Sequence, residues 1–158
     1  MSAALRRAEG GADVAETLQT ASDLDRALEH FLALGHNRAL GLELAGHGAG
    51  WIEFRMPWRR EITADGEGIA PGAIYSLLDS VCALTTWARQ GFFTNNPTLD
   101  LRVDFLRPPT PGRGLVARGE CWRIGGDLAN MRGIAHEGNP DDPVAQCTGA
   151  FIVVEKRS

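Results

Sequence analysis

The chain has 158 residues, of which 44% are hydrophobic and 23% charged, and its formal net charge is -4. This length allows one domain with a real core and is too short for two ordinary domains. An acidic chain without clustered lysines and arginines is a poor partner for nucleic acid. Since no run of about 18 apolar residues occurs, we also expect no association with a membrane.

The three cysteines, Cys82, Cys121 and Cys147, are widely spaced and form neither a C-x-x-C motif nor a cluster with histidines. Such cysteines are typical of free thiols in the core of a protein from a reducing compartment. The first 12 residues are small, polar and glycine-containing, so we expect them to be disordered. They also lack the apolar run of a signal peptide. We therefore expect a cytoplasmic protein that holds neither a metal nor a cofactor.

The first ordered element should be a packing helix over residues 14–34, where apolar side chains recur with a period of 3.6 residues. Two short alternating segments follow, at residues 39–45 and 51–58, and predict a β-hairpin. The hairpin turn, G-H-G-A-G at residues 46–50, contains the glycines of a phosphate-binding loop. Because no helix follows this turn, a dinucleotide site is not expected there.

After a polar stretch at residues 61–68, residues 72–90 predict a long helix that is apolar nearly all round. One stripe of this helix carries Ile74, Leu77 and Leu78, and the opposite stripe carries a single acid, Asp79. A carboxylate buried on such a helix is costly unless it is paired or used in catalysis.

The remainder of the chain predicts four strands in a meander, at residues 98–106, 114–124, 128–136 and 144–154. Alternation in the first of them places Thr98 on the polar side with Asp100 and Arg102, away from Leu99 and Leu101. The sequence thus predicts a single α+β domain over residues 13–158, with about six antiparallel strands curved around the buried helix. Unprotected edge strands predict a homodimer or homotetramer.

Four segments resemble the hotdog-fold acyl-CoA thioesterases of the phenylacetate-degradation type. The two more specific segments are residues 68–80, which include L-L-D, and T-L-D-L-R-V-D-F-L-R-P at residues 98–108. The other two, G-x-x-x-A-x-G-E near residues 114–120 and A-Q-C-T-G-A-F at residues 145–151, are more general. Together the similarity extends over about residues 40–154.

This resemblance implies hydrolysis of an acyl-CoA thioester at a subunit interface. It implies that the start of the buried helix points at the thioester carbonyl. It also implies that Asp79 acts as general base or nucleophile, and that Thr98, contributed by the partner subunit, orients it. The chemistry is reasonable on physical grounds, because a helix N-terminus and a carboxylate supply an oxyanion site and a base.

The chain departs from the family at the start of this helix, where the usual H-G-G is replaced by Ala70, Pro71 and Gly72. In the family the middle glycine donates its N–H to the thioester oxygen, and proline has no N–H. Either the Gly72 N–H replaces this donor or the site is lost. The polar residue that the family places upstream is Ala64 here, so Asp65 or Glu67 is a candidate substitute.

Two alternatives remain open at this stage. A degenerate hotdog protein would bind an acyl thioester or another apolar ligand without turning it over. A hotdog dehydratase or hydratase would need a histidine paired with the helix acid, and no histidine lies close to Asp79 in the sequence.

Other residues near the acid are weaker candidates. Ser76 has no G-x-S-x-G motif and no neighbouring base in sequence, so it is a candidate substrate contact or hydrogen-bond partner of Asp79 rather than a triad serine. Tyr75 and Trp87 are candidates for the wall of the acyl pocket. The identity of the acyl group is not predicted.

Overall fold

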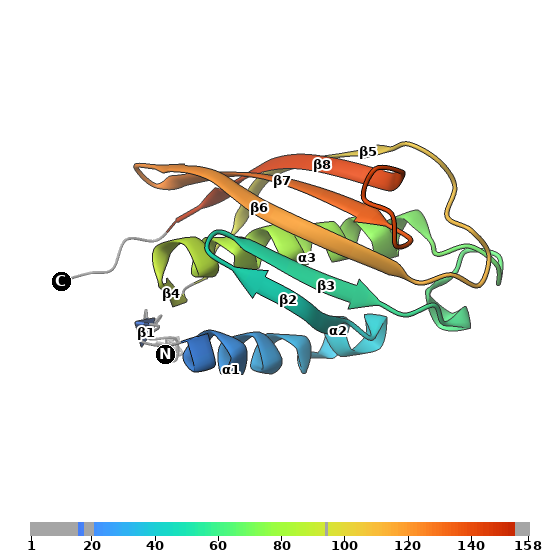
Figure 1. Cartoon of the computed structure of the whole chain (residues 1–158), viewed down its shortest axis with the longest axis horizontal. Helices are drawn as coiled ribbons and strands as arrows, with labels where there is room; N and C mark the ends of the chain where they lie inside the picture. The colour runs from blue at the N-terminus through green and yellow to red at the C-terminus, as the bar shows by residue number, and fades with distance from the viewer. Residues whose placement is uncertain (1–15, 18–20, 94, 154–158) are drawn as a thin grey trace, which may run out of the picture.

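The computed structural model describes residues 16–17, 21–93 and 95–153. Its main layer is a six-stranded antiparallel sheet that curves over one long helix, α3, as Figure 1 shows. The helices are α1 (Ala21–Leu32), α2 (Gly35–Leu40) and α3 (Pro71–Gln90), with a 3₁₀ turn at Arg60–Ile62. The strands of the sheet are β2 (Glu43–Gly48), β3 (Trp51–Met56), β5 (Thr98–Phe105), β6 (Leu115–Gly125), β7 (Leu128–His136) and β8 (Pro143–Ile152). This architecture confirms the predicted fold class.

The strand order is β2-β3-β6-β7-β8-β5, so the predicted meander of four strands is wrong in one respect. β6, β7 and β8 follow one another, but β5 pairs with β8, for example at Arg102 and Thr148. The segment between β5 and β6 contains Pro108, Pro109 and Pro111, which hold it out of a tight hairpin. The chain therefore crosses the end of the sheet before β6 begins, and β5 becomes an edge strand.

The N-terminal part of the domain also differs from the prediction. The helix does not run over residues 14–34, because Glu16 and Thr17 form strand β1, which pairs with Phe92 and Phe93 of β4 (Phe92–Phe93). Residues 39 and 40 belong to α2, which ends at Gly41 in a left-handed conformation (φ 67°). A glycine in this conformation stops the helix and shortens the predicted strand. The expected disorder of residues 1–12 lies outside the described residues.

Helix α3 packs on the sheet through side chains such as Ile74, Leu77, Leu78 and Val81, which are fully covered. The expectation that it is buried nearly all round is wrong, because Tyr75 is 41% exposed and Asp79 is only half-buried. The closest approach is at Gly119 of β6, where a Cβ atom would lie 2.9 Å from Thr85 Oγ1 and 3.0 Å from the Val81 carbonyl oxygen. A side chain at residue 119 would therefore push the helix backbone away. Because Gly119 has no side chain, α3 packs directly on the sheet at this point.

All three cysteines are buried and free, which confirms the prediction of core thiols. Cys82 of α3 and Cys147 of β8 lie with their sulfur atoms 3.6 Å apart. This hydrogen bond, together with burial, raises the pKa of the Cys82 thiol. Burial also raises the pKa of the Cys121 thiol. Among the described residues, no helix is long and apolar enough to cross a membrane.

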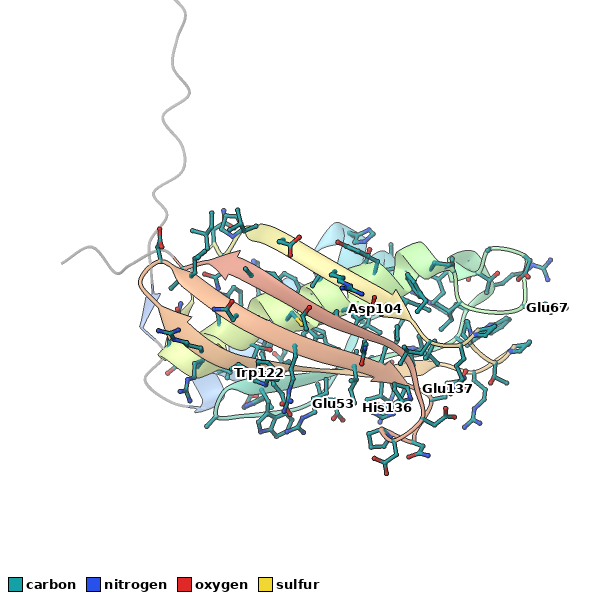
Figure 2. All side chains as sticks on the ribbon, turned by 90° about the horizontal axis from the view of Figure 1, so that it is seen from above. Glu53, Glu67, Asp104, Trp122, His136 and Glu137 are labelled. Atoms are coloured by element: carbon teal, nitrogen blue, oxygen red, sulfur yellow. The ribbon has the colours of Figure 1, made fainter. Side chains whose placement is uncertain are left out.

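One end of the sheet carries two adjacent buried or nearly buried groups, His136 and Glu137, which Figure 2 labels. Burial acts to raise the pKa of Glu137, but hydrogen bonds from the Thr110 backbone and hydroxyl and from Arg107 outweigh it and hold that pKa below the ordinary 4.5. His136 Nδ1 accepts the Gly138 N–H at 3.0 Å. Burial lowers the pKa of His136 below 6.5, although Glu53 opposes this effect.

The contact at Gly119 predicts the cost of a single methyl group. We expect Gly119→Ala to lower the free energy of unfolding by about 1 to 3 kcal/mol, since the added Cβ overlaps helix backbone atoms. Gly125→Ala is the matched control, because a Cβ there meets only the Arg123 side chain, at 3.5 Å or more. Urea unfolding followed by circular dichroism measures the free energy of unfolding of both variants and of the wild type. Equal stability of the two variants would show that α3 tolerates displacement.

The buried His136 predicts a pH dependence of stability. Its folded-state pKa lies below that of the unfolded chain, so between the two values the unfolded chain binds more protons. We expect the free energy of unfolding to fall as the pH decreases below about 6.5, before the carboxylates protonate. In His136→Asn, whose side-chain oxygen can still accept the Gly138 N–H, this decline between pH 7 and 5 should flatten. Parallel pH profiles for wild type and variant would contradict the prediction.

Candidate active site

The candidate site begins at the N-terminus of α3. Pro71 occupies the first turn, and the Ala70 carbonyl accepts the Ala73 and Ile74 N–H groups at 3.0 and 3.2 Å. The Ala70 N–H donates to Ile62 O at 2.9 Å, which ties the start of the helix to the 3₁₀ turn. Among the described residues, the Gly72 N–H has no hydrogen-bond partner, and apart from chain neighbours and the backbone of the same helix no atom lies within 4 Å of the Cβ position at this residue. An unpaired donor therefore lies at the positive end of the helix.

Gly72, Ser76 and Asp79 form one stripe of α3. At 3.6 residues per turn they lie within about 60° of one another around the helix axis. Asp79 and Ser76 are half-buried and Gly72 is exposed, although neighbouring residues on the other faces, such as Leu77 and Leu78, are fully buried. The polar stripe is therefore the part of α3 that the rest of the chain leaves accessible.

Asp79 is paired with Thr98, the first residue of β5. Thr98 Oγ1 donates to Asp79 Oδ1 at 2.8 Å, which brings together the two residues predicted to be catalytic. The bond is formed within one chain, whereas the sequence analysis expected the hydroxyl to come from a partner subunit. The predicted orientation of Thr98 is also wrong, because a bulge between Thr98 and Asp100 breaks the strand alternation. The bulge turns Thr98 towards α3 and leaves Leu99 58% exposed.

Ser76 has a partner that the sequence analysis missed. His36 of α2 lies with Nε2 3.1 Å from Ser76 Oγ, although 40 residues separate them in the chain. No base lies near Ser76 in the sequence, but the fold brings one to it from α2. The sequence carries no signal of this contact, because residues 35–38 belong to neither the predicted helix nor the predicted strand. The imidazole contacts Ser76 rather than the helix acid.

A cavity of about 220 Å³ lies beside the start of α3. It connects the histidine and serine pair with the helix terminus. The residues that line it include His36, Glu61, Thr63, Ala70, Gly72 and Ser76. Pro71 is exposed on the helix surface and is not among the lining residues. The unpaired Gly72 N–H and the Ser76 hydroxyl therefore share one cavity.

The remaining predicted site residues lie outside this cavity. Tyr75 is 41% exposed, and its hydroxyl donates to the Leu101 carbonyl at 2.8 Å, on the β5 side of the helix. Trp87 packs edge-to-face on Phe31 of α1, with ring centroids 6.2 Å apart, and is not among the residues that line this cavity, so its place in an acyl-pocket wall stays a prediction. Asp65 Oδ1 accepts the Glu67 N–H at 2.9 Å within the preceding loop. The acid at the cavity is Glu61.

The described residues contain no group of three or more His, Cys, Asp or Glu side chains that could hold a metal ion. The chemistry that this arrangement can supply comes from one carboxylate with an ordered hydroxyl partner, a free backbone donor and a serine with an imidazole neighbour. A base and an oxyanion site on one helix stripe are suited to water attack on an activated carbonyl.

Comparison with known proteins agrees with this chemistry. The model of the thioesterase superfamily matches residues 69–143, which include α3 and the strands around Asp79. A Pseudomonas aeruginosa protein of known crystal structure is 30% identical, with a TM-score of 0.75 over 83% of this chain and 98% of its own. A Thermoplasma acidophilum protein named as an esterase is 28% identical over 66% of this chain and 78% of its own.

The curved sheet around a buried helix is the hotdog fold. The PaaI protein of the Escherichia coli phenylacetic acid degradation operon shares it, with a TM-score of 0.71 over 83% of this chain and 92% of its own, at 18% identity. That likeness concerns the fold alone. With the match over α3 and the 30% identical structure, the chain belongs to the thioesterase superfamily.

Proposed function

We propose that the protein hydrolyses an acyl-CoA thioester to the free acid and CoA, with Asp79 as general base or nucleophile. The observation that supports this most strongly is the 2.8 Å hydrogen bond from Thr98 to Asp79, about two helical turns beyond the free Gly72 N–H. The bond occupies Oδ1 and leaves Oδ2 for a water molecule or for the thioester carbon. The superfamily match supplies the reaction class.

In the general-base route, Asp79 removes a proton from water as the water oxygen attacks the thioester carbon. The negative charge that develops on the carbonyl oxygen is held by the Gly72 N–H at the positive end of α3. The tetrahedral intermediate then breaks its carbon–sulfur bond, and the CoA thiolate receives the proton that Asp79 had taken. In the nucleophilic route the Asp79 carboxylate attacks the thioester carbon and displaces the CoA thiolate to form an acyl anhydride, and water then hydrolyses this anhydride to the free acid and the regenerated carboxylate. Both routes need the same alignment of Asp79 with Gly72.

The assembly we propose is a homodimer or homotetramer in which a second copy covers this stripe. Large apolar side chains are exposed along the edge strand β5 and beside it, including Leu99 (58%), Phe105 (49%) and Tyr75 (41%). β5 has a pairing partner on one side only. An exposed apolar edge favours association with another edge. Such a partner would shield Asp79 from bulk solvent and complete the walls of the acyl pocket.

Pro71 is the observation that favours the second candidate function, a protein that binds an acyl thioester without hydrolysis. It removes the N–H that the family uses, and it lies at the position the sequence analysis assigned to it. The two candidate functions differ in whether the bound thioester is hydrolysed. The free thiols Cys82, Cys121 and Cys147 support a reducing compartment such as the cytoplasm for either one.

Substitution of the acid tests the proposed reaction. Release of CoA thiol from a panel of aryl-, short- and long-chain acyl-CoAs is measured for wild type and Asp79→Asn. We expect kcat to fall at least about 100-fold, the scale for loss of a general base. Thr98→Val, which keeps the shape but removes the donor, should lower kcat about 5- to 10-fold, and Thr98→Ser should retain activity.

Asp127→Asn, in the exposed turn between β6 and β7, is the matched control and should retain wild-type kcat. A folded wild type that is inert on the whole panel would reject hydrolysis in favour of binding without turnover. Full activity of Asp79→Asn would reject the assigned base.

The exposed edge predicts which substitutions dissociate the protein. We expect Leu99→Lys to shift the molar mass measured by light scattering from an oligomer towards a monomer, because it places a charge in the proposed interface. Leu34→Lys is the control, since Leu34 is also exposed (46%) but lies between α1 and α2. An oligomer that survives Leu99→Lys but dissociates in Trp122→Lys would place the interface on the outer face of the sheet instead.

A further inference from the structure

The pair formed by His36 and Ser76 has no role in the mechanism above, although it lines the same cavity as the free Gly72 N–H. We propose that Ser76 donates the second hydrogen bond to the thioester carbonyl oxygen and that His36 is its positioning residue. This inference rests on the proposed function and concerns the same site. It explains how an oxyanion site can exist after Pro71 has removed the donor used elsewhere in the family.

The geometry of the helix places the two donors together. Ser76 follows Gly72 by four residues, so the two lie on the same face of α3. Side chains on a helix lean towards its N-terminus, which directs the Ser76 hydroxyl over the turn that contains Gly72. Apart from its chain neighbours and the backbone of its own helix, no protein atom lies within 4 Å of the Cβ position at Gly72, so the space beside this residue is open to a ligand.

The imidazole determines which way the serine proton points. With its Nε2 protonated, His36 donates to Ser76 Oγ across the 3.1 Å contact. The serine oxygen then acts as acceptor for His36, and its own proton remains available for the ligand. A serine without this neighbour could turn its proton towards a backbone carbonyl of the preceding helical turn. His36 therefore holds the hydroxyl in the donating orientation.

Asp79 lies three residues beyond Ser76 on the same stripe, with its carboxylate held by Thr98. Residues three apart on a helix are neighbours, about 5 to 6 Å between Cβ atoms. A carbonyl oxygen held between Gly72 and Ser76 would therefore present its carbon to a water molecule on Asp79. The cavity of about 220 Å³ lies on the Gly72 and Ser76 side of this stripe and has room for the carbonyl end of the ligand, whereas Asp79 is not among its lining residues.

Steady-state kinetics with an accepted acyl-CoA test the two roles. We expect Ser76→Ala to lower kcat about 100-fold with KM changed less than about 3-fold, because the lost donor acts mainly on the oxyanion. His36→Leu should lower kcat about 10-fold, and His36→Gln, whose amide N–H can replace Nε2–H, should restore most of it. The double variant should be no slower than Ser76→Ala alone, since the imidazole acts only through the hydroxyl.

His30→Leu is the matched control, as an exposed histidine on α1 away from the cavity, and should retain wild-type kcat. If Asp79→Asn is inert while Ser76→Ala and His36→Leu keep the wild-type kcat, hydrolysis stands and this inference is wrong. An acyl group covalently attached to Ser76, detected by intact mass, would also overturn it, because the serine would then be the nucleophile.

Binding provides a readout that does not require turnover. Two unreactive CoA analogues are compared by calorimetry, a ketone that keeps the carbonyl and a thioether that lacks it. Ser76→Ala should weaken the binding of the ketone analogue about 3- to 10-fold, the scale of one hydrogen bond, and leave the affinity for the thioether unchanged. Equal effects on both analogues, or none on either, would overturn the inference even in a protein that does not hydrolyse its ligand.

Discussion

The contact between α3 and the sheet at Gly119 is the constraint on which the rest of the structure depends. The Val81 carbonyl and the Thr85 hydroxyl approach this residue so closely that a single methyl group would displace the helix. Because α3 rests on the sheet at this depth, its sheet-facing side chains are covered and the side that carries Gly72, Ser76 and Asp79 remains accessible. The rotation and height of the helix thereby fix the positions of Gly72, Ser76 and Asp79 relative to one another.

Three polar side chains on the accessible part of α3 are held by elements far away in the sequence. Thr98 of β5 holds Asp79, His36 of α2 holds Ser76, and the Leu101 carbonyl accepts the Tyr75 hydroxyl. A polar group on a largely apolar helix is costly unless it has such a partner. These pairs also restrict the side chains to single orientations, which a reaction at a carbonyl requires. The same contacts thus serve stability and alignment.

Local pattern was sufficient to predict α3, the hairpin of β2 and β3, and the strands β6 to β8, because their burial repeats with the period of the element. It was also sufficient to single out Asp79 as the one acid on an apolar helix. It failed where the outcome depends on distant contacts. The pairing of β5 with β8 and the bulge at Thr98 are set by neighbours across the sheet. The approach of His36 to Ser76 depends on how α2 packs, over a separation of 40 residues.

Pro71 shows why loss of one family feature does not by itself decide the fate of a site. The first N–H groups of any helix have no partner within the helix, so a proline in the first turn removes one donor and leaves the next in place. Moving the donor from residue 71 to 72 shifts it about 1.5 Å along the axis and about 100° around it. Gly72 lines the cavity that also contains Ser76 and His36, whereas Pro71 does not. Under the proposed function, an oxyanion site with Gly72 as donor would therefore lie closer to a hydroxyl and an imidazole than one with a donor at residue 71.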